Sequence, residues 1–541
     1  MINDRLIVLA AGAAIAFAIA VPASAGAQET PGHEHGQHHD HGGAPGDLGT
    51  VRFPISCAAA AQDDFDRGLA LLHSFGYELA RESFRGAATG DPRCGMAWWG
   101  VAMTYYHPLW AAPSPEELRA GAEAAERATA LGSKQDRERG YIDAIAAFYR
   151  DAATRDHAER ARAYRDQLEQ LAARLPDESE ARIFHALALL GTAPPSDATL
   201  AQQRRAGEIL NQELERQPRH PGIVHYLIHS FDYPGLADLA LDAARAYAGI
   251  APASPHAQHM PSHIFTRLGL WQESIRSNLD SEASANAIVA KKHPGATSMD
   301  ALHALDYLAY AYLQLGQVEE ARKVLERGLR AQSFDDPNFV GGYSLSAMPA
   351  RFALERRAWK EAAALERPAV ALPWDRFAYA QAITPFARAI GAARSGDVAV
   401  ARAAVEELVE IQARLAASPP AGPYDWAGLV ESLRLSAAGW LAHAEGRNDQ
   451  AVELARSGAD LQDRVGKHPV TPGEVLPARE LLADLLAELG RPADALAEYE
   501  KTLALHPNRR NALEGASRAA EATGASDKAR KLRAAMASLE G

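Results

Sequence analysis

Two histidine pairs at a fixed separation constrain this chain more than any other feature of its sequence. His225 and His229 are four residues apart, and so are His259 and His263. Corresponding members of the two pairs are 34 residues apart, since 259 − 225 and 263 − 229 both equal 34. A spacing of four places two side chains on one helix face, and a period of 34 is typical of a helix–turn–helix repeat. The pattern predicts two adjacent helices that direct four imidazoles toward one region.

Small residues and prolines recur along the rest of the chain at constant spacing. Ala80 precedes Pro92 by 12 residues, and Ala495 precedes Pro507 by the same number. A small residue lets two helices approach closely, and a proline ends the second helix. From about residue 58 onward, no stretch shows the alternating pattern of a strand. The sequence therefore predicts an all-α fold made of repeated helix pairs.

The segment LLADLLAELGRPADALAEYEKTLALHP, residues 481–507, resembles the tetratricopeptide repeat (TPR) family. Weaker copies extend the resemblance over most of residues 58–541, in roughly a dozen units. The resemblance implies a TPR helical-repeat solenoid, in which antiparallel helix pairs form a right-handed superhelix. We expect an N-terminal solenoid with a histidine-rich groove at residues 58–335 and a C-terminal solenoid at residues 336–541.

In this family, the first helix of each unit lines the concave groove, and the register of the resemblance assigns residues to that surface. The first-choice groove histidines are those of the two pairs. Further groove residues implied by the register, or adjacent to the pairs, are His73, His107, His185, Tyr226, Asp232, His256, His303, Asp306 and Tyr310.

A metal site is the main hypothesis for the clustered histidines. Neutral imidazoles on adjacent helices are suitable ligands for divalent transition metals, of which Zn or Cu are most suitable here and Ni or Fe are alternatives. His225, His229, His259 and His263 are the expected ligands. His256, His185 and His303 are candidates for a second metal position or for substrate contact. The alternatives are a polar groove that binds a substrate or peptide without metal, and structural packing.

Whether such a site is catalytic stays open. His225 and His229 have the spacing of a metalloprotease H-E-x-x-H motif, but Tyr226 stands where the glutamate base would be. Asp232 and Asp306 are candidates to orient an imidazole, to bind metal directly or to act as a general base. They could equally be charges at helix ends.

Pro261 lies between His259 and His263, inside an expected helix. A proline removes one amide donor and bends or ends a helix, so we expect a local distortion beside these histidines. The Met-Pro pattern recurs at Met348-Pro349, where Arg351 occupies the position of His263. A solvated arginine is the simpler interpretation, and contact with an anionic ligand is the alternative.

The N-terminal residues predict export and a polar segment. Residues 1–25 combine Arg5, an apolar run and Ala23-Ser24-Ala25, the parts of a secretory signal peptide. Residues 26–57, with five histidines between 33 and 41, are expected to be disordered, either as a linker or as a low-affinity metal-collecting tail. A periplasmic or secreted location would allow Cys57 and Cys94 to form a disulfide, with two buried thiols as the alternative.

Composition limits the partners. The formal net charge is −13, and no cluster of Lys and Arg offers a phosphate-binding surface, so nucleic acid is not an expected partner. No stretch after the signal peptide approaches the roughly 20 apolar residues of a membrane helix. The expected ligand is a small molecule or a peptide in the groove. The competing function is that of a TPR scaffold for protein binding without metal.

Overall fold

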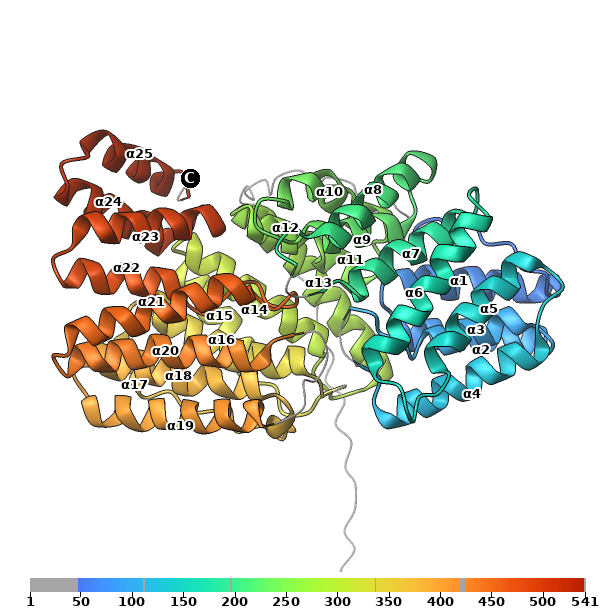
Figure 1. Ribbon diagram of the computed structural model, residues 1–541, viewed down its shortest axis with the longest axis horizontal. Helices are drawn as coiled ribbons and strands as arrows, with labels where there is room; N and C mark the ends of the chain where they lie inside the picture. Colours follow the sequence, from blue (N-terminus) through green and yellow to red (C-terminus); the bar gives the residue numbers. More distant parts are fainter. Residues whose placement is uncertain (1–46, 110–111, 195–196, 336, 418–423, 540–541) are drawn as a thin grey trace, which may run out of the picture. The chain divides into compact units, whose positions relative to one another are not determined.

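The chain folds almost entirely into helices (Figure 1). The computed structural model describes residues 47–109, 112–194, 197–335, 337–417 and 424–539. Those residues form 25 α-helices and three short 3-10 helices. Over the same ranges, the isolated bridge between Thr297 and Phe334 is the only β pairing. The predicted all-α solenoid of helix pairs is confirmed.

The helices of the first half have the following bounds: α1 (Gln62–His73), α2 (Tyr77–Gly90), α3 (Gly95–Met103), α4 (Pro115–Leu131), α5 (Asp136–Tyr149), α6 (His157–Arg174), α7 (Ser179–Gly191), α8 (Ala201–Arg216), α9 (Pro221–Phe231), α10 (Leu241–Ile250), α11 (Pro255–His259), α12 (Pro261–Arg267) and α13 (Trp271–Lys292). Those of the second half are α14 (Met299–Gln314), α15 (Val318–Leu329), α16 (Phe339–Glu355), α17 (Trp359–Ala363), α18 (Ala378–Ser395), α19 (Val398–Ala416), α20 (Trp426–Ala444), α21 (Asn448–Val465), α22 (Ala478–Glu488), α23 (Pro492–Leu505), α24 (Arg510–Ala522) and α25 (Ser526–Ala537). The 3-10 helices are η1 (Ala59–Ala61), η2 (Ala237–Ala240) and η3 (Trp374–Arg376).

Glycines followed five residues later by an alanine mark the turns inside several helix pairs of the second half. Gly316 follows α14 with a φ of 72°, and Gly490 follows α22 with the same φ. This left-handed conformation suits glycine because it has no Cβ. Five residues later, Ala321 and Ala495 are fully buried where the second helix meets the first. Glycine therefore reverses the chain and alanine permits close packing, which gives the antiparallel pairs.

The apolar core divides into two large clusters within one compact unit, His41–Gly541. The fully buried part of the first cluster ends at Phe265, and that of the second begins at Trp271. The boundary predicted between residues 335 and 336 does not coincide with this division. The reason is that α14 and α16 pack directly against each other across it.

The predicted disorder of residues 26–57 is wrong for residues 47–57. Phe53 is 1% exposed, and its ring lies 5.0 Å from that of Tyr141 and 5.4 Å from that of Phe65. Asp47 forms an ion pair with Arg219 at 2.7 Å. A buried aromatic residue provides the apolar contact that the composition of the segment did not suggest. The signal peptide predicted at residues 1–25 and residues 26–46 lie outside the described residues.

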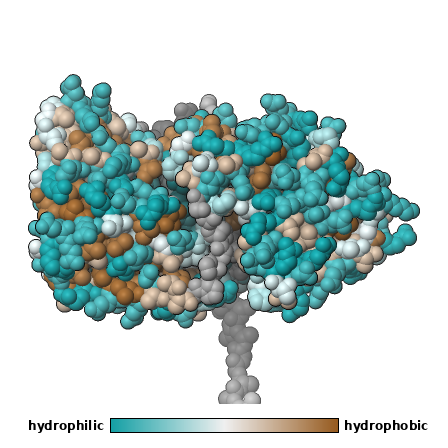
Figure 2. Space-filling view, viewed as in Figure 1, coloured by the Kyte–Doolittle hydropathy of each residue, from teal (hydrophilic) through white to brown (hydrophobic). Residues whose placement is uncertain are grey.

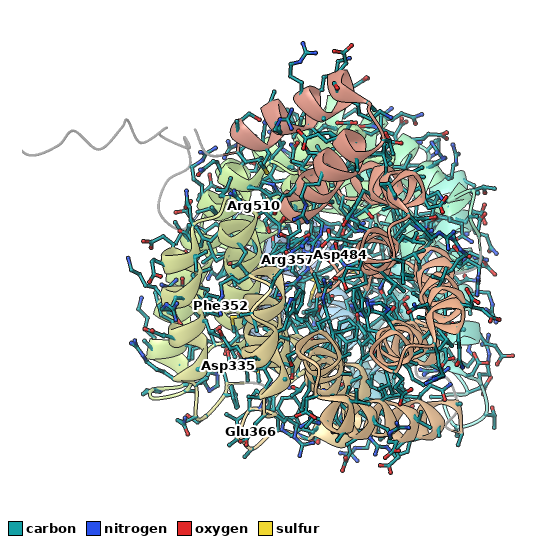
Figure 3. All side chains as sticks on the ribbon, turned by 90° about the vertical axis from the view of Figure 1, so that its left-hand side faces the viewer. Asp335, Phe352, Arg357, Glu366, Asp484 and Arg510 are labelled. Carbon is teal, nitrogen blue, oxygen red and sulfur yellow. A yellow bond between two sulfur atoms is a disulfide. The ribbon has the colours of Figure 1, made fainter. Side chains whose placement is uncertain are left out.

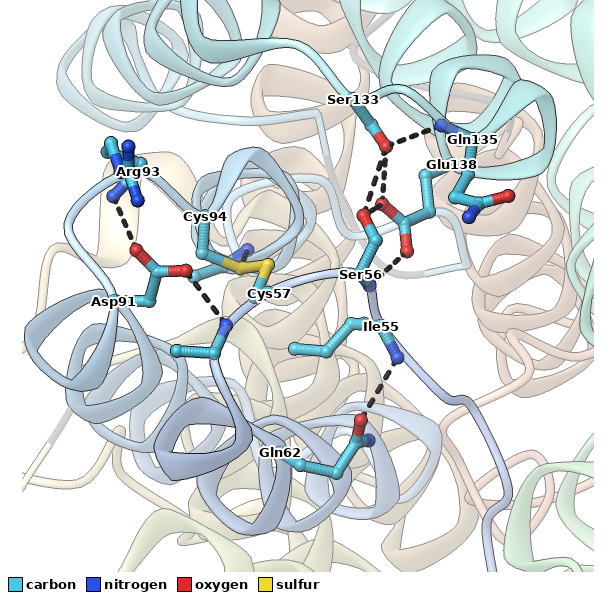
Figure 4. The surroundings of a disulfide bond; sticks show 12 residues. Ile55, Ser56, Cys57, Gln62, Asp91, Arg93, Cys94, Ser133, Gln135 and Glu138 are labelled. Atoms are coloured by element: carbon cyan, nitrogen blue, oxygen red, sulfur yellow. Dashed lines mark hydrogen bonds between the residues drawn. A yellow bond between two sulfur atoms is a disulfide. The ribbon is translucent and has the colours of Figure 1, made fainter.

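Cys57 and Cys94 form a disulfide, with their α-carbons 5.2 Å apart. Figure 4 shows this bridge beside two hydrogen bonds that hold the same segment, from the amide of Ala58 to Asp91 and from the amide of Ser56 to Glu138. The pair that the sequence singled out thus joins the segment before α1 to the start of α3.

A helix break occurs where Pro261 predicted one. α11 ends at His259, and α12 begins at Pro261. In contrast, α16 continues through Pro349. The Met-Pro pattern alone therefore does not break a helix.

The connection between α21 and α22, residues 466–477, lies inside the groove rather than on the surface, and we call it the inner loop. Residues 471–477 are all buried. Tyr307 donates a hydrogen bond to the carbonyl of Val470 at 3.3 Å, and Tyr343 donates one to the carbonyl of Gly473 at 3.3 Å. The groove-facing positions of α14 and α16 are therefore covered by the chain itself.

A network of charged residues ties the C-terminal helices together. Arg357, after α16, and Asp484, in α22, lie next to each other in Figure 3 and form an ion pair at 3.4 Å. Asp484 also pairs with Arg394 of α18 at 2.9 Å. Figure 1 shows α22, α23 and α24 lying one above another.

Polar residues cover most of the face shown in Figure 2, with small apolar areas between them. Among the described helices, none has the length and apolar character needed to cross a membrane.

Removing the disulfide should loosen the first repeat. Its cysteines are 37 residues apart in sequence, so cross-linking them removes chain entropy from the unfolded state worth about 3 to 4 kcal/mol. We expect the double variant Cys57→Ser/Cys94→Ser to lower the opening free energy of amides in α1–α3 by that amount, measured by native-state hydrogen exchange. Amides in α24 are the internal control. Equal exchange in α1–α3 with and without the bridge would contradict this prediction.

Candidate metal centre

Three histidines from α9 and α11 form one compact group, which we call the first triad. It consists of His225, His229 and His256. The Nε2 atom of His225 lies 3.1 Å from Nε2 of His229 and 3.0 Å from Nε2 of His256. The i, i+4 spacing on α9 places the first two together, and the next repeat supplies the third.

A second group lies beside the first and contains His259, His263 and His303, from α11, α12 and α14. We call it the second triad. The Nε2 atoms of His259 and His263 are 3.1 Å apart, and the ring centroid of His303 is 4.2 Å from that of His259. The sequence predicted that the two histidine pairs would form one cluster of four. Instead, each pair takes a further histidine, and both of these, His256 and His303, were candidates for a second metal position.

The two triads adjoin. The rings of His229 and His263 have centroids 6.4 Å apart, and so do those of His256 and His259. The short helix α11 contributes one histidine to each triad. The helix break at Pro261 separates two residues of the second triad, His259 and His263.

Neighbouring groups fix the orientation of three of these rings. His225 donates from Nδ1 to the carbonyl of His73 at 2.6 Å. His259 donates from Nδ1 to Oδ1 of Asn278 at 2.7 Å, and the amide of Asn278 is itself oriented by donating to the Ser274 carbonyl. His263 donates from Nδ1 to Asp232 at 3.1 Å. A neutral imidazole that carries its proton on Nδ1 has a lone pair on Nε2.

The Nε2 atoms of His259 and His263 therefore face each other as two acceptors. Two acceptors 3.1 Å apart do not form a hydrogen bond with each other. A cation between them would satisfy both lone pairs. Ligand nitrogens at about 2.0 to 2.1 Å from one zinc ion lie about 2.9 to 3.4 Å apart at ordinary coordination angles. The spacings His225–His229, His225–His256 and His259–His263 fall in this range.

Burial keeps these imidazoles neutral. It lowers the pKa of His225 to about 3 and that of His259 to about 3. Burial, and then the neighbouring histidines, lower the pKa of His229, His256 and His303 well below the usual value. A neutral imidazole is the form that binds a metal.

The triads form part of the wall of a cavity of about 910 Å³. Four of the six histidines line it: His229, His256, His263 and His303. Apolar side chains of the same wall include those of Leu190, Leu200, Leu429 and Leu461. Residues 466–470 of the inner loop also line the cavity.

Asp232, at the C-terminal end of α9, connects the second triad to the inner loop. Besides accepting from His263, it pairs with Lys467 at 3.0 Å and with Arg267 at 2.8 Å. Burial alone would raise the pKa of Asp232, but Lys467 and Arg267 hold it well below its usual range. Burial lowers the pKa of Lys467 to about 8. Of the roles considered for Asp232, the structure shows that of orienting an imidazole.

Several residues that the TPR register assigned to the groove lie elsewhere. His185 is half-buried on α7 near Glu169, and it belongs to neither triad. The ring of His107 packs against that of Tyr77, with centroids 4.3 Å apart, and His107 does not line the cavity. His185 and His107 therefore do not join the triads.

Asp306 and Tyr310 are buried under the C-terminal half. Asp306 pairs with Arg351 at 3.5 Å, and the hydroxyl of Tyr310 accepts from Arg509 at 3.1 Å. Arg351 itself is fully buried and donates to the carbonyl of Glu474 at 2.7 Å. Asp306 is therefore not a partner of the histidines, and the interpretation of Arg351 as a solvated residue is wrong.

His73 and Tyr226 lie behind the first triad, fully buried, rather than in the groove. The Nδ1 atom of His73 is 3.0 Å from the Tyr226 hydroxyl, and its Nε2 atom is 3.0 Å from Glu180. The other oxygen of Glu180 is 2.7 Å from Nε2 of His220. Hydrogen bonds account for both ring nitrogens of His73 and for Nε2 of His220. The role of this cluster at the site is to fix the carbonyl that orients His225.

Sequence reasoning missed two residues that support the second triad, Asn278 by a bond to His259 and Lys467 by an ion pair with Asp232. Asn278 is on α13, and Lys467 is 235 residues after Asp232. Neither carries a periodic signal. His220 could have been noticed, because it lies five residues before His225.

Sequence comparison identifies one repeat. Residues 303–335, which begin in α14 and include α15, match the family model of the tetratricopeptide repeat. The match covers 33 of 541 residues (335 − 303 + 1), so it shows this repeat type for one helix pair. No curated protein sequence matches the chain significantly.

Solved structures with a related arrangement share little sequence with this chain. The human IFIT1 dimer with m7Gppp-AAAA is 11% identical, with 87% of this chain and 94% of that chain covered and a TM-score of 0.39. Yeast Tom70 is 12% identical, with 86% and 96% covered and a TM-score of 0.34. The chain spans 62% of the matched chain in the structure of Naa15/Naa10 bound to HypK-THB, with 88% of this chain covered, 13% identity and a TM-score of 0.24. At these values, the similarities support no argument about this chain.

The charge of Asp232 should matter to stability. In Asp232→Asn, Lys467 and Arg267 would lose their buried counter-ion, and losses of about 3 to 5 kcal/mol are typical when one partner of a buried pair is removed. We expect a clearly lower unfolding midpoint in urea, measured by circular dichroism. Asp197→Asn is the control, because Asp197 lines the same cavity but bonds only within its own loop. A similar loss in both variants would contradict the prediction.

Proposed function

We propose that this chain binds two divalent transition-metal ions, one in each triad, in the wall of the internal cavity. Each triad offers three neutral imidazoles whose ligand atoms all lie within 4.8 Å of one another. Imidazole ligands suit Zn and Cu best among the available metals. These two metals are therefore the proposed cofactors.

The observation that carries the proposal is the pair of facing Nε2 atoms in His259 and His263. Both rings have their Nδ1 proton committed, to Asn278 and to Asp232. A proton between the two Nε2 atoms would make one ring cationic, and burial opposes this by lowering the pKa of both. A metal ion satisfies both lone pairs without protonating either ring.

The ligand count supports a site with an open position. Among the described residues, neither triad includes a fourth His, Cys, Asp or Glu. Catalytic zinc sites commonly have three protein ligands and one exchangeable position. Metal-dependent chemistry on a molecule in the cavity is therefore part of the proposal. Asp232, already engaged by two cations, would act by positioning His263 rather than as a base.

The second candidate function is a TPR scaffold that binds a protein or peptide without metal. The repeat match at residues 303–335 favours it. However, the inner loop covers the groove-facing side of α14 and α16. The remaining cavity of about 910 Å³ is within the usual range of small-molecule pockets. A peptide would have to bind at its rim or displace the loop.

We further propose that the protein is periplasmic or secreted, with residues 1–25 as its signal peptide. The bridge between Cys57 and Cys94 supports this, because stable disulfides are usual in oxidising compartments.

Metal content tests the function. The full chain with its five tail histidines (33, 35, 38, 39 and 41) replaced by Gln should bind two Zn²⁺ or Cu²⁺ ions, counted by elemental analysis after dialysis. His229→Ala and His303→Ala should each leave one ion, and the double variant should leave none, because each change reduces one triad to two ligands.

The matched control is His185→Ala, a histidine outside both triads, which should retain two ions. Retention of two ions by the His229→Ala/His303→Ala protein would place the ligands elsewhere. Failure of the unaltered protein to bind stoichiometric metal would favour the scaffold function.

A further inference from the structure

We propose that the cavity takes a small amphiphilic anion, with an oxyanion head such as a carboxylate at the two triads and an apolar body along the leucine wall. This inference rests on the proposed metal sites and goes beyond them, because it specifies the chemical class of the ligand.

Charge balance provides the first argument. Two divalent ions bound by six neutral imidazoles keep all four positive charges, since the ligands contribute none. Uncompensated charge in a buried site is costly. A ligand with negative oxygen atoms would lower that cost and would fill the open coordination positions.

The protein side chains beside the triads do not supply this charge. Asp232 is the acidic residue that contacts a triad histidine. It is outnumbered by its two cationic partners, Lys467 and Arg267. Together these three side chains add one further positive charge.

Other acidic side chains on the cavity wall have partners of their own. Asp463 pairs with Arg479, and Glu474 lies 3.5 Å from His506. Asp425 accepts from the amide of Gly428 at the start of α20. Asp197 accepts from its own loop, and Asp300 is exposed at the start of α14. None of them belongs to either triad, so none supplies a ligand charge there.

Lys467 is placed to contact the head of the ligand. Lys467 lines the cavity, and its ammonium donates to Asp232 at 3.0 Å and to the carbonyl of Pro469 at 3.2 Å. An ammonium has three N–H donors, so one remains for a ligand. Its side chain is only 3% exposed, which makes a charged contact there strong.

Four leucines of the wall offer apolar surface for the body of the ligand. Leu190, Leu200, Leu429 and Leu461 face the same cavity as the four accessible histidines. Rings of the two triads are only 6.4 Å apart at their closest pairs. One small molecule can therefore contact both triads with its head while burying a hydrocarbon chain.

Cobalt-loaded full-length protein provides the test, since Co²⁺ occupies histidine sites and its visible absorption reports changes in coordination. Hexanoate, hexanamide and acetate are the probes. Hexanamide has the hydrocarbon chain of hexanoate without its charge, and acetate has the charge without most of the chain. Hexanoate should change the cobalt spectrum and bind at least about tenfold more tightly than either of the others, a difference of about 1.4 kcal/mol.

Lys467→Met and Arg464→Met form the variant pair. Arg464 lines the same cavity, but its guanidinium donates to the carbonyl of Asp460 in its own helix. Lys467→Met should weaken the binding of hexanoate about tenfold, while the protein retains two Co²⁺ ions. Arg464→Met should change the affinity for hexanoate less than about twofold.

The outcomes separate the two proposals. Protein that binds no stoichiometric cobalt overturns the proposed metal sites. Protein that binds two Co²⁺ ions but responds equally to hexanoate and hexanamide, or to neither, overturns only the inference of an anionic ligand. If Lys467→Met fails to fold, the comparison of hexanoate with hexanamide on the unaltered chain still decides.

Discussion

The facing lone pairs of buried, neutral imidazoles are the constraint on which the rest of the site depends. An unsatisfied polar group in a low-dielectric interior is costly, and here the Nε2 acceptors of His259 and His263 face each other at 3.1 Å. The neighbouring groups increase the constraint rather than relieve it. The His73 carbonyl, Asn278 and Asp232 each accept a hydrogen bond from the Nδ1–H group of a ring, which leaves a lone pair on the Nε2 atom of that ring. Such an arrangement is costly without a cation and well prepared for one.

The inner loop determines what such a site can do. An open helical solenoid presents a long groove, suitable for an extended partner. Here the carbonyls of Val470 and Gly473 accept from tyrosines of α14 and α16, and Lys467 reaches Asp232. The C-terminal half therefore closes the groove over the triads. What remains is a cavity with histidines and leucines in its wall, which suits a small molecule.

The sequence predicted the parts of this site that follow from local periodicity. The 34-residue separation identified the histidine pairs, and Pro261 predicted the helix break, because both depend on residues close in the chain. The division into two triads was not predictable from spacing, since it depends on how α9, α11, α12 and α14 are rotated about their axes. Register failed for Tyr226 on α9 and for His73 on α1, which are both fully buried. Contacts from distant segments, such as that of Lys467, have no periodic signal. For the same reason, the burial of Phe53 contradicted a prediction of disorder based on composition alone.

The central claim is that each triad holds one metal ion, and anomalous diffraction from crystals of the zinc- or copper-loaded protein tests it most directly. Data collected at the absorption edge of the metal locate the ions independently of any assumed ligand. We predict two anomalous peaks per chain, one among His225, His229 and His256 and the other among His259, His263 and His303, each about 2.0 to 2.1 Å from the Nε2 atoms. Peaks confined to other residues, or triads without a peak in stoichiometrically loaded crystals, would contradict the account.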